Sequence, residues 1–275
     1  MKLNMIFLLI ALFFYVLTTF SLISYFKTFK ENILKKSNLL LISGFFAHIL
    51  YFFSRWIFSK HFPVTTLFEA LSFFALTIVF FQILIDIKYK VKGIAFFSVL
   101  LATTLIMVSL CFQYTITSLP PILNSIWLPV HVFFAFLGNG IFAISFCVSI
   151  LYLIQLKQVK SKKITEGFFK MPSLETLDAL NYKCLTIGFP LLTLGIITGS
   201  LWASSAWGSY WSWDPKEVWS LVTWFLYAAL LHGRLNSGWR GKRGAIFSII
   251  AFLVVLFTFI GVNTLIPGLH SYANR

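Results

Sequence analysis

Most tryptophans of this chain gather in one short stretch, and aromatic side chains at that density can bind a flat ligand. Six of the nine belong to it: Trp202, Trp207, Trp211, Trp213, Trp219 and Trp224. Each indole offers a broad apolar face with one N–H at its edge, which suits a flat, hydrophobic macrocycle. Gly208 permits a close approach or an unusual φ within the stretch. An aromatic belt at a membrane interface is the alternative, but a belt spreads its rings among many helix ends.

The segment Asp214-Pro215-Lys216-Glu217 admits two interpretations. Asp at the N-cap, Pro at the first helical position and Glu at the third make a capping arrangement at the start of a helix. Alternatively, Asp214 and Glu217 could act as an acid and a base beside the tryptophans. The sequence favours the cap and leaves the second role open.

Two of the five histidines are placed to bind a metal held by a macrocycle. His131 follows Trp127 and Pro129 at the start of one apolar stretch, and His270 lies just past the end of the last one. By the topology inferred below, both lie on the same side of the membrane as the tryptophans. Two neutral imidazoles that converge on an apolar aromatic platform are what axial ligation of haem iron requires. Hydrogen bonding of either ring to water or backbone at the interface is the alternative.

The other histidines lie within or beside apolar stretches. His232 lies near the end of one stretch and is followed by Arg234, while His48 lies in the middle of another. An ionisable residue inside a membrane is a functional candidate, although a hydrogen bond to a neighbouring helix would equally explain His48. His48 and His61 point roughly 140° apart on one helix, so they do not form a single-helix pair of haem ligands. We assign no role to either.

The composition shows which elements must position these side chains. Of the 275 residues, 59% are hydrophobic and 11% are charged, and the mean hydropathy is +0.88. About eight apolar stretches have the length, roughly 20 residues, that crosses a bilayer as a helix. The candidate spans are 3–26, 37–58, 65–86, 91–112, 126–155, 182–203, 216–235 and 244–266. We therefore predict an all-α integral membrane protein, a polytopic bundle in which residues 1–275 form a single transmembrane domain.

The net charge of +14 is explained by topology rather than by nucleic-acid binding, because Lys and Arg fall in every second loop. The basic loops contain Lys27 to Lys36, Lys88 to Lys92, Lys157 to Lys183 and Arg234 to Arg243. The positive-inside rule makes these loops cytoplasmic. Both termini and the tryptophan-rich loop 202–219 are then extracytoplasmic, and segment 157–181 is a basic cytoplasmic connector.

The three cysteines, Cys111, Cys147 and Cys184, support neither a disulfide framework nor a zinc site, because no two form a C-x-x-C pair. A C-x-x-C-H sequence is also missing. The chain is therefore not itself a c-type cytochrome.

From Trp207 to Trp219 the sequence resembles the tryptophan-rich motif of the haem-handling superfamily that includes CcsA/ResC, CcmC and CcmF, and it is most similar to CcsA/ResC. The flanking segments agree: Leu128-Pro-Val-His131, Tyr227-Ala-Ala-Leu-Leu-His232-Gly-Arg234 and Gly268-Leu-His270-Ser-Tyr272. Together they cover most of residues 126–273. The match nearer the N-terminus is looser, since Thr66 stands where the family usually has Asn and Phe68 where it has Tyr. No function is carried onto that segment.

The resemblance implies a haem-handling subunit of a system II cytochrome c synthase, which exports haem b and presents it outside for thioether attachment to C-x-x-C-H apocytochromes. It implies that His131 and His270 are the outer axial ligands and that His232 binds a haem in transit. The expected haem contacts are Trp207, Trp211, Trp213, Trp219, Asp214 and Arg234. No side chain is assigned as a nucleophile or general base, because the iron chemistry belongs to the haem.

The resemblance further implies a CcsB/ResB-like membrane partner, since the outer loops are too short to seat an apocytochrome unaided. The expected location is a bacterial cytoplasmic membrane, or a thylakoid membrane for a plastid-encoded chain. Two other functions stay open: a haem or planar-ligand exporter without ligation activity, and a structural subunit of a respiratory complex. A measurement of thioether formation would distinguish the exporter from a synthase subunit. Absorbance of bound haem would test the structural role, which predicts no haem.

Overall fold

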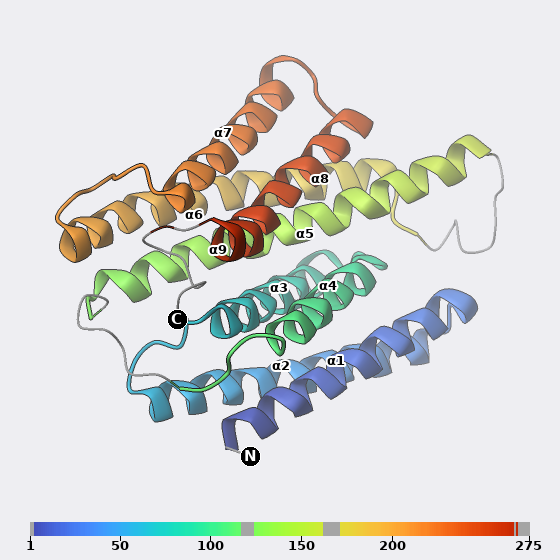
Figure 1. Ribbon diagram of the computed structural model, residues 1–275. Coiled ribbons are helices and arrows are strands. Elements are labelled where there is room, and N and C mark those ends of the chain that lie inside the picture. The colour runs from blue at the N-terminus through green and yellow to red at the C-terminus, as the bar shows by residue number, and fades with distance from the viewer. Residues whose placement is uncertain (1–2, 117–123, 162–170, 267, 269–275) are drawn as a thin grey trace. The chain divides into compact units, whose positions relative to one another are not determined.

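The computed structural model describes residues 3–116, 124–161, 171–266 and 268 (Figure 1). These residues form helices joined by short connections, and no strand occurs among them. The helices are α1 (Leu3–Thr28), α2 (Glu31–Ser59), α3 (Leu67–Tyr89), α4 (Ile94–Ser109), α5 (Trp127–Ser161), α6 (Leu174–Trp207), α7 (Pro215–Asn236), α8 (Lys242–Leu256), the π-helix η3 (Phe257–Gly261) and α9 (Val262–Leu265). The predicted all-α polytopic fold class is confirmed. The side of the membrane on which the termini lie stays a prediction.

Six of the described helical segments are long and apolar enough to cross a membrane. They are α1, α2, α3, α5, α6 and the continuous run from Lys242 to Leu265. Of the other two predicted spans, α4 is apolar but has only 16 residues. The second, α7, has Lys216 and Glu217 in its first turn and Arg234 in its last turn, so its ends are more polar.

Several helices extend beyond the predicted spans. α5 continues to Ser161 and α6 begins at Leu174, so much of the predicted connector 157–181 is helical where it is described. The tryptophan-rich segment 202–219 is likewise mostly helical, since α6 ends at Trp207 and α7 begins at Pro215. Only residues 208–214 form an irregular connection, which we call the tryptophan loop.

The chain divides into two compact units, and each is described by itself. Unit 1 comprises Met1–Ser118 and Ile154–Ser173, and unit 2 comprises Leu119–Leu153 and Leu174–Arg275. The division falls within α5, whose last turns belong to unit 1.

In unit 1, α1 and α2 pack side by side, and α4 contacts both α1 and α3 (Figure 1). A small residue lets the first two helices approach closely: a Cβ added at Gly44 would lie 2.7 Å from the Tyr15 ring. Farther along the same pair, the hydroxyls of Ser21 and Ser37 share a hydrogen bond of 2.7 Å. Polar groups of the two helices thus satisfy each other within an apolar environment.

In unit 2, glycines line the contact between α5 and α6. A Cβ at Gly138 would lie 2.8 Å from the Leu192 nitrogen, and one at Gly195 would lie 3.0 Å from the Ala135 backbone. Such small residues allow two helix backbones to approach closely in a membrane protein. Because the backbones are close, a side chain at the start of α5 can reach carbonyl groups of α6. That property defines the site described below.

Candidate functional site

His131 lies in the first turns of α5 and is partly buried. Its Nδ1 lies 2.7 Å from the carbonyl oxygen of Gly195 on α6. Since a carbonyl oxygen can only accept, Nδ1 carries the proton and donates this hydrogen bond. In the neutral ring, Nε2 is then the nitrogen with the lone pair. Metal-ligating histidines commonly use the same arrangement, in which the other ring nitrogen donates to a carbonyl.

Two further residues of α6 fix the plane of the His131 ring. A Cβ added at Gly199 would lie only 2.7 Å from Nδ1, so the absence of a side chain there makes room for the imidazole. Trp202, which is 5% exposed, lies parallel to the ring with centroids 6.1 Å apart and an interplanar angle of 9°. The imidazole is thus held in one orientation between the two helices.

The indole of Trp202 continues this contact toward the tryptophan loop. Trp207, in the last turn of α6, meets Trp202 edge to face with ring centroids 4.8 Å apart. His131, Trp202 and Trp207 therefore form one aromatic cluster in unit 2. The tertiary structure brings His131 to one end of the predicted tryptophan platform.

The tryptophan loop contains a second aromatic pair. The rings of Trp211 and Trp213 meet edge to face at 5.9 Å, and Trp213 is 71% exposed. Gly208 begins the loop with a φ of +75°, which glycine adopts without strain. Trp219 lies on α7, where its ring contacts Phe257 of the π-helix with ring centroids 4.6 Å apart. Each tryptophan of the predicted platform thus has an aromatic neighbour within unit 2.

The start of α7 has the capping box predicted from the sequence. Asp214 is the N-cap, its Oδ1 accepts from the Lys216 N–H at 3.0 Å, and Glu217 Oε2 accepts from the Asp214 N–H at 3.2 Å. Pro215 occupies the first helical position. The capping interpretation is confirmed. Haem contact by Asp214 stays a prediction. The residue is buried, with 6% of its surface exposed.

The C-terminal part of unit 2 packs against this helix start. Lys216 Nζ donates to Asn263 Oδ1 of α9 at 3.3 Å. Gly268 approaches so closely that an added Cβ would lie 2.5 Å from Asp214 Oδ2. His270, the second predicted outer ligand, follows two positions later and lies outside the described residues.

Arg234 and His232 occupy the opposite end of α7. Arg234 forms an ion pair with Asp178 of α6, with Nη2–Oδ2 at 2.6 Å and Nη1–Oδ1 at 2.9 Å. The same carboxylate accepts the Gly241 N–H at 2.8 Å, so the pair ties together three segments of unit 2. His232 is exposed, and its ring lies 3.2 Å from Asn236 Nδ2 on the same helix. The predicted haem roles of Arg234 and His232 stay predictions.

His48 of unit 1 has a hydrogen-bond partner on each neighbouring helix. Its Nδ1 lies 3.3 Å from Tyr15 Oη of α1, and its Nε2 lies 3.0 Å from Ser72 Oγ of α3. The ring is completely buried. Of the two explanations that the sequence left open, the hydrogen bond to a neighbouring helix matches this geometry. His61 lies at the end of α2, with Nδ1 3.1 Å from the Phe62 carbonyl oxygen.

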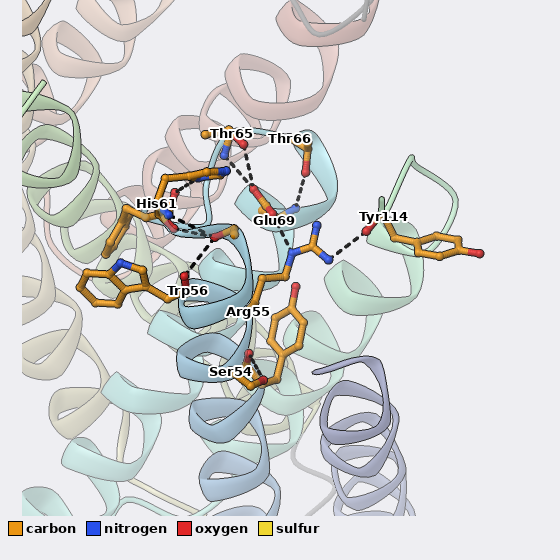
Figure 2. A network of polar contacts seen from close by, with 11 residues as sticks. Ser54, Arg55, Trp56, His61, Thr65, Thr66, Glu69 and Tyr114 are labelled. Carbon is orange, nitrogen blue, oxygen red and sulfur yellow. Dashed lines mark hydrogen bonds and ion pairs between the residues drawn. The ribbon is translucent and has the colours of Figure 1, made fainter. Parts of the chain in front are cut away.

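Sequence reasoning missed a buried ion pair in unit 1. Figure 2 shows Arg55 Nε directed at Glu69 Oε1, 2.7 Å away, while Arg55 Nη1 donates to the Tyr114 carbonyl oxygen at 2.9 Å. Glu69 Oε2 also accepts the N–H of Thr65 at 2.9 Å, and Thr66 caps α3 by accepting the Glu69 N–H. The signal was present, because Arg55 and Glu69 both fall inside predicted spans, where charged residues pair with one another.

Comparisons with known proteins show the family of this chain. A family model described as "Cytochrome C assembly protein" matches residues 64–270. The CcsA cytochrome c biogenesis protein of Mesostigma viride is 38% identical over 270 residues, which cover 88% of each chain. The CcsA protein of Prochlorococcus marinus is 38% identical over 248 residues, covering 79% of this chain and 78% of that protein.

A solved structure has the same fold. The structure named "Cytochrome c Heme Lyase CcmF" matches with a TM-score of 0.67 at 18% identity and covers 94% of this chain. The match spans 46% of the CcmF chain, so this protein has less than half of that structure's length. The family model covers both the His131 helix and the tryptophan loop, and the two relatives match over 88% and 78% of their own length. This chain therefore belongs to the cytochrome c assembly protein family.

Proposed function

We propose that this chain is the haem-handling subunit of a system II cytochrome c synthase. In this proposal it receives haem b, holds it at the tryptophan loop of unit 2 and presents it for thioether attachment to apocytochrome c. Family membership supports a role in cytochrome c biogenesis. The chain contributes binding and orientation, while the haem supplies the iron and the vinyl groups that react.

The geometry of His131 is the observation that carries the proposal. Its Nδ1–H is engaged by the Gly195 carbonyl, so the neutral ring presents Nε2 as the donor atom for iron. Trp202 and Trp207 lie next to the ring, and Trp211 and Trp213 follow in the exposed loop. An imidazole bordered by indole faces matches the chemistry of a haem, which has an iron centre within a flat apolar ring. His270 is the proposed second axial ligand.

The proposed topology places the tryptophan loop and both termini outside the cytoplasm. The charge pattern supports it, because basic loops alternate with nearly uncharged ones along the sequence. The membrane is then a bacterial cytoplasmic membrane or a thylakoid membrane. His232 lies near the end of α7, next to the basic loop, and would bind a haem in transit. A cysteine introduced by Ser209→Cys tests this topology. Reaction with an impermeant maleimide only from the cytoplasmic side would refute it.

A membrane partner completes the proposed synthase. Seven residues, 208–214, form the irregular part of the tryptophan-rich segment, which is little surface for holding a protein substrate. A CcsB/ResB-like chain would supply the extracytoplasmic surface that docks the apocytochrome. The thioether then forms between a haem vinyl group and a cysteine thiol of C-x-x-C-H, with this chain holding the ring in place.

Two measurements on the purified complex of this chain with such a partner test the function. We expect a Soret absorption band that follows this chain through purification. We also expect covalent haem on an added C-x-x-C-H apocytochrome under reducing conditions. A complex that binds and releases haem but leaves the apocytochrome unmodified would instead be an exporter. A complex without any Soret band would be a structural assembly and would refute the proposal.

A further inference from the structure

The carboxylate of Glu217 accepts hydrogen bonds from the tryptophan loop on both sides of Trp213. Its Oε2 accepts the N–H of Ser212 at 2.8 Å and the N–H of Asp214 at 3.2 Å. Its Oε1 accepts the Ser212 hydroxyl at 3.3 Å. For its part in the capping box, the Glu217 side chain needs only the hydrogen bond from the N–H of the N-cap residue, Asp214. The two bonds to Ser212 therefore go beyond what starting α7 demands.

The backbone between these two hydrogen bonds is strained. Trp213 has a φ of +58°, in the left-handed region that bulky residues rarely adopt. Its indole is 71% exposed, so burial of the ring does not compensate. Such conformations persist when the surrounding structure over-determines them, and they concentrate at ligand clamps. Here the over-determining contact is the Glu217 carboxylate, which holds the residues on either side.

The neighbouring indole is positioned by the same turn. Ser209 Oγ donates to the Trp211 carbonyl oxygen at 2.9 Å, and the Trp211 ring rests edge to face on Trp213. Fixing the backbone at 212–214 thus sets the direction of both rings, the exposed Trp213 and the half-buried Trp211. An unfixed loop would let Trp213 relax to negative φ, and its indole would then point elsewhere.

We infer that Glu217 is the positioning residue of the haem platform: it acts through Trp211 and Trp213 and does not itself contact the ligand. The inference rests on the proposed haem-binding function. It gives Glu217 a role distinct both from helix capping alone and from acid–base chemistry. It also distinguishes Glu217 from Asp214, whose Oδ1 accepts the N–H of Lys216 at the start of α7.

The test compares Glu217→Gln with Glu217→Ala by titrating haem into the purified protein. Gln can place its amide oxygen at the Oε2 position, accept from both N–H groups and donate its NH₂ to the Ser212 hydroxyl. We expect Glu217→Gln to bind haem with nearly unchanged affinity and Glu217→Ala to lose about tenfold, as a displaced binding group does. Equal losses in both variants would mean that the charge acts on the ligand directly, which would overturn the inference.

A matched control variant distinguishes the positioning role of Glu217 from a purely structural one. Ser220→Ala removes a hydroxyl that donates to the Glu217 carbonyl oxygen, one turn into α7, and leaves the carboxylate contacts intact. We expect its haem affinity to equal that of the unaltered chain. If Glu217→Ala lowered the amount of folded protein but bound haem with unchanged affinity per folded molecule, Glu217 would only cap the helix.

Amide hydrogen exchange, measured without haem, tests the positioning role of Glu217 without relying on haem affinity. The Ser212 and Asp214 amides should be protected in the unaltered chain and in Glu217→Gln, and should exchange freely in Glu217→Ala. Unprotected amides in a chain that does bind haem would refute the positioning role. Failure of the unaltered chain to bind haem, with these amides protected, would instead refute the proposed function.

Discussion

His48 and His131 are both histidines on long apolar helices, yet their surroundings give them different capacities. In unit 1, both ring nitrogens of His48 lie within hydrogen-bond distance of side chains, Tyr15 and Ser72, and the ring is fully buried. In unit 2, His131 is partly exposed, its Nδ1 is engaged by a backbone carbonyl, and its faces meet aromatic and glycine surfaces. Metal-ligating histidines commonly have the arrangement seen at His131, in which one ring nitrogen donates to a backbone carbonyl.

The same contrast holds for the charged residues of the two units. Arg55 and Glu69 in unit 1 are 1% and 2% exposed. They form hydrogen bonds with each other and with nearby backbone groups. Glu217 in unit 2 instead directs its carboxylate at the loop that contains Trp211 and the exposed Trp213. The Arg55–Glu69 pair thus joins helices of unit 1, as Arg234–Asp178 does in unit 2, whereas Glu217 fixes the backbone of the tryptophan loop.

Replacing His131 should have the largest effect on function. His131→Gly removes the proposed ligand and leaves a space, so we expect loss of the low-spin haem spectrum and of cytochrome c maturation. Added imidazole is small enough to enter that space and should partly restore both. His270→Gly should behave in the same way if it supplies the second ligand. Absorption spectroscopy and thioether formation measure the two effects.

His48→Gly is the control that the comparison provides. We expect it to keep the haem spectrum per folded molecule, because its partners are Tyr15 and Ser72 rather than a ligand. Imidazole should have no effect on it. A wild-type spectrum in His131→Gly, or loss of haem in His48→Gly, would remove the distinction drawn between the two histidines.

Breaking the ion pair of unit 1 should have the largest effect on stability. Arg55→Ala leaves the Glu69 carboxylate buried without its counter-charge, which typically costs about 3–5 kcal/mol. We expect a lower thermal unfolding temperature in detergent and less inserted protein. The double variant Arg55→Met with Glu69→Leu should recover part of the loss, since neither charge is then buried alone. A single variant as stable as the unaltered chain would contradict this account.

Gly199→Ala should weaken haem binding without removing any ligand. Its Cβ would lie 2.7 Å from His131 Nδ1, so the ring must shift away from the Gly195 carbonyl. Disturbing such a supporting hydrogen bond typically costs about 10- to 100-fold in metal affinity. Gly44→Ala, where a Cβ would meet the Tyr15 ring at 2.7 Å, is the matched change in unit 1. It should affect stability but not haem affinity, and equal haem losses in both would argue against the His131 assignment.

Trp213→Ala should have the smallest of these effects. One exposed indole contributes contact area to a flat ligand, and its loss should weaken haem binding by about fivefold. The protein should insert normally, because no backbone hydrogen bond depends on the ring. Trp211→Ala should have a similar effect. The measurement is haem per protein, and loss of protein with unchanged haem per molecule would instead support the aromatic-belt interpretation.

Much of the architecture follows from the sequence. Apolar stretches of bilayer length determined the eight helical segments to within a few residues at most ends, because the membrane requires every backbone group to be paired within a helix. The Asp214 to Glu217 pattern likewise determined the cap of α7, since its contacts are local in sequence. The tryptophan cluster is also local in sequence, so the proposed haem platform can be predicted from residue types alone.

The tertiary structure decided what depends on contacts between helices. No spacing in the sequence indicates that Gly195 presents its carbonyl to His131, or that Gly199 leaves room for the ring, because these contacts join α5 to α6 across more than sixty positions. The sequence likewise does not indicate that Arg234 pairs with Asp178. Helix periodicity tells which residues share a face, but only packing sets which face of another helix they meet. The sequence thus identified the histidines and tryptophans by type, and the packing of α5 on α6 decided that Nδ1 of His131 donates to the Gly195 carbonyl oxygen.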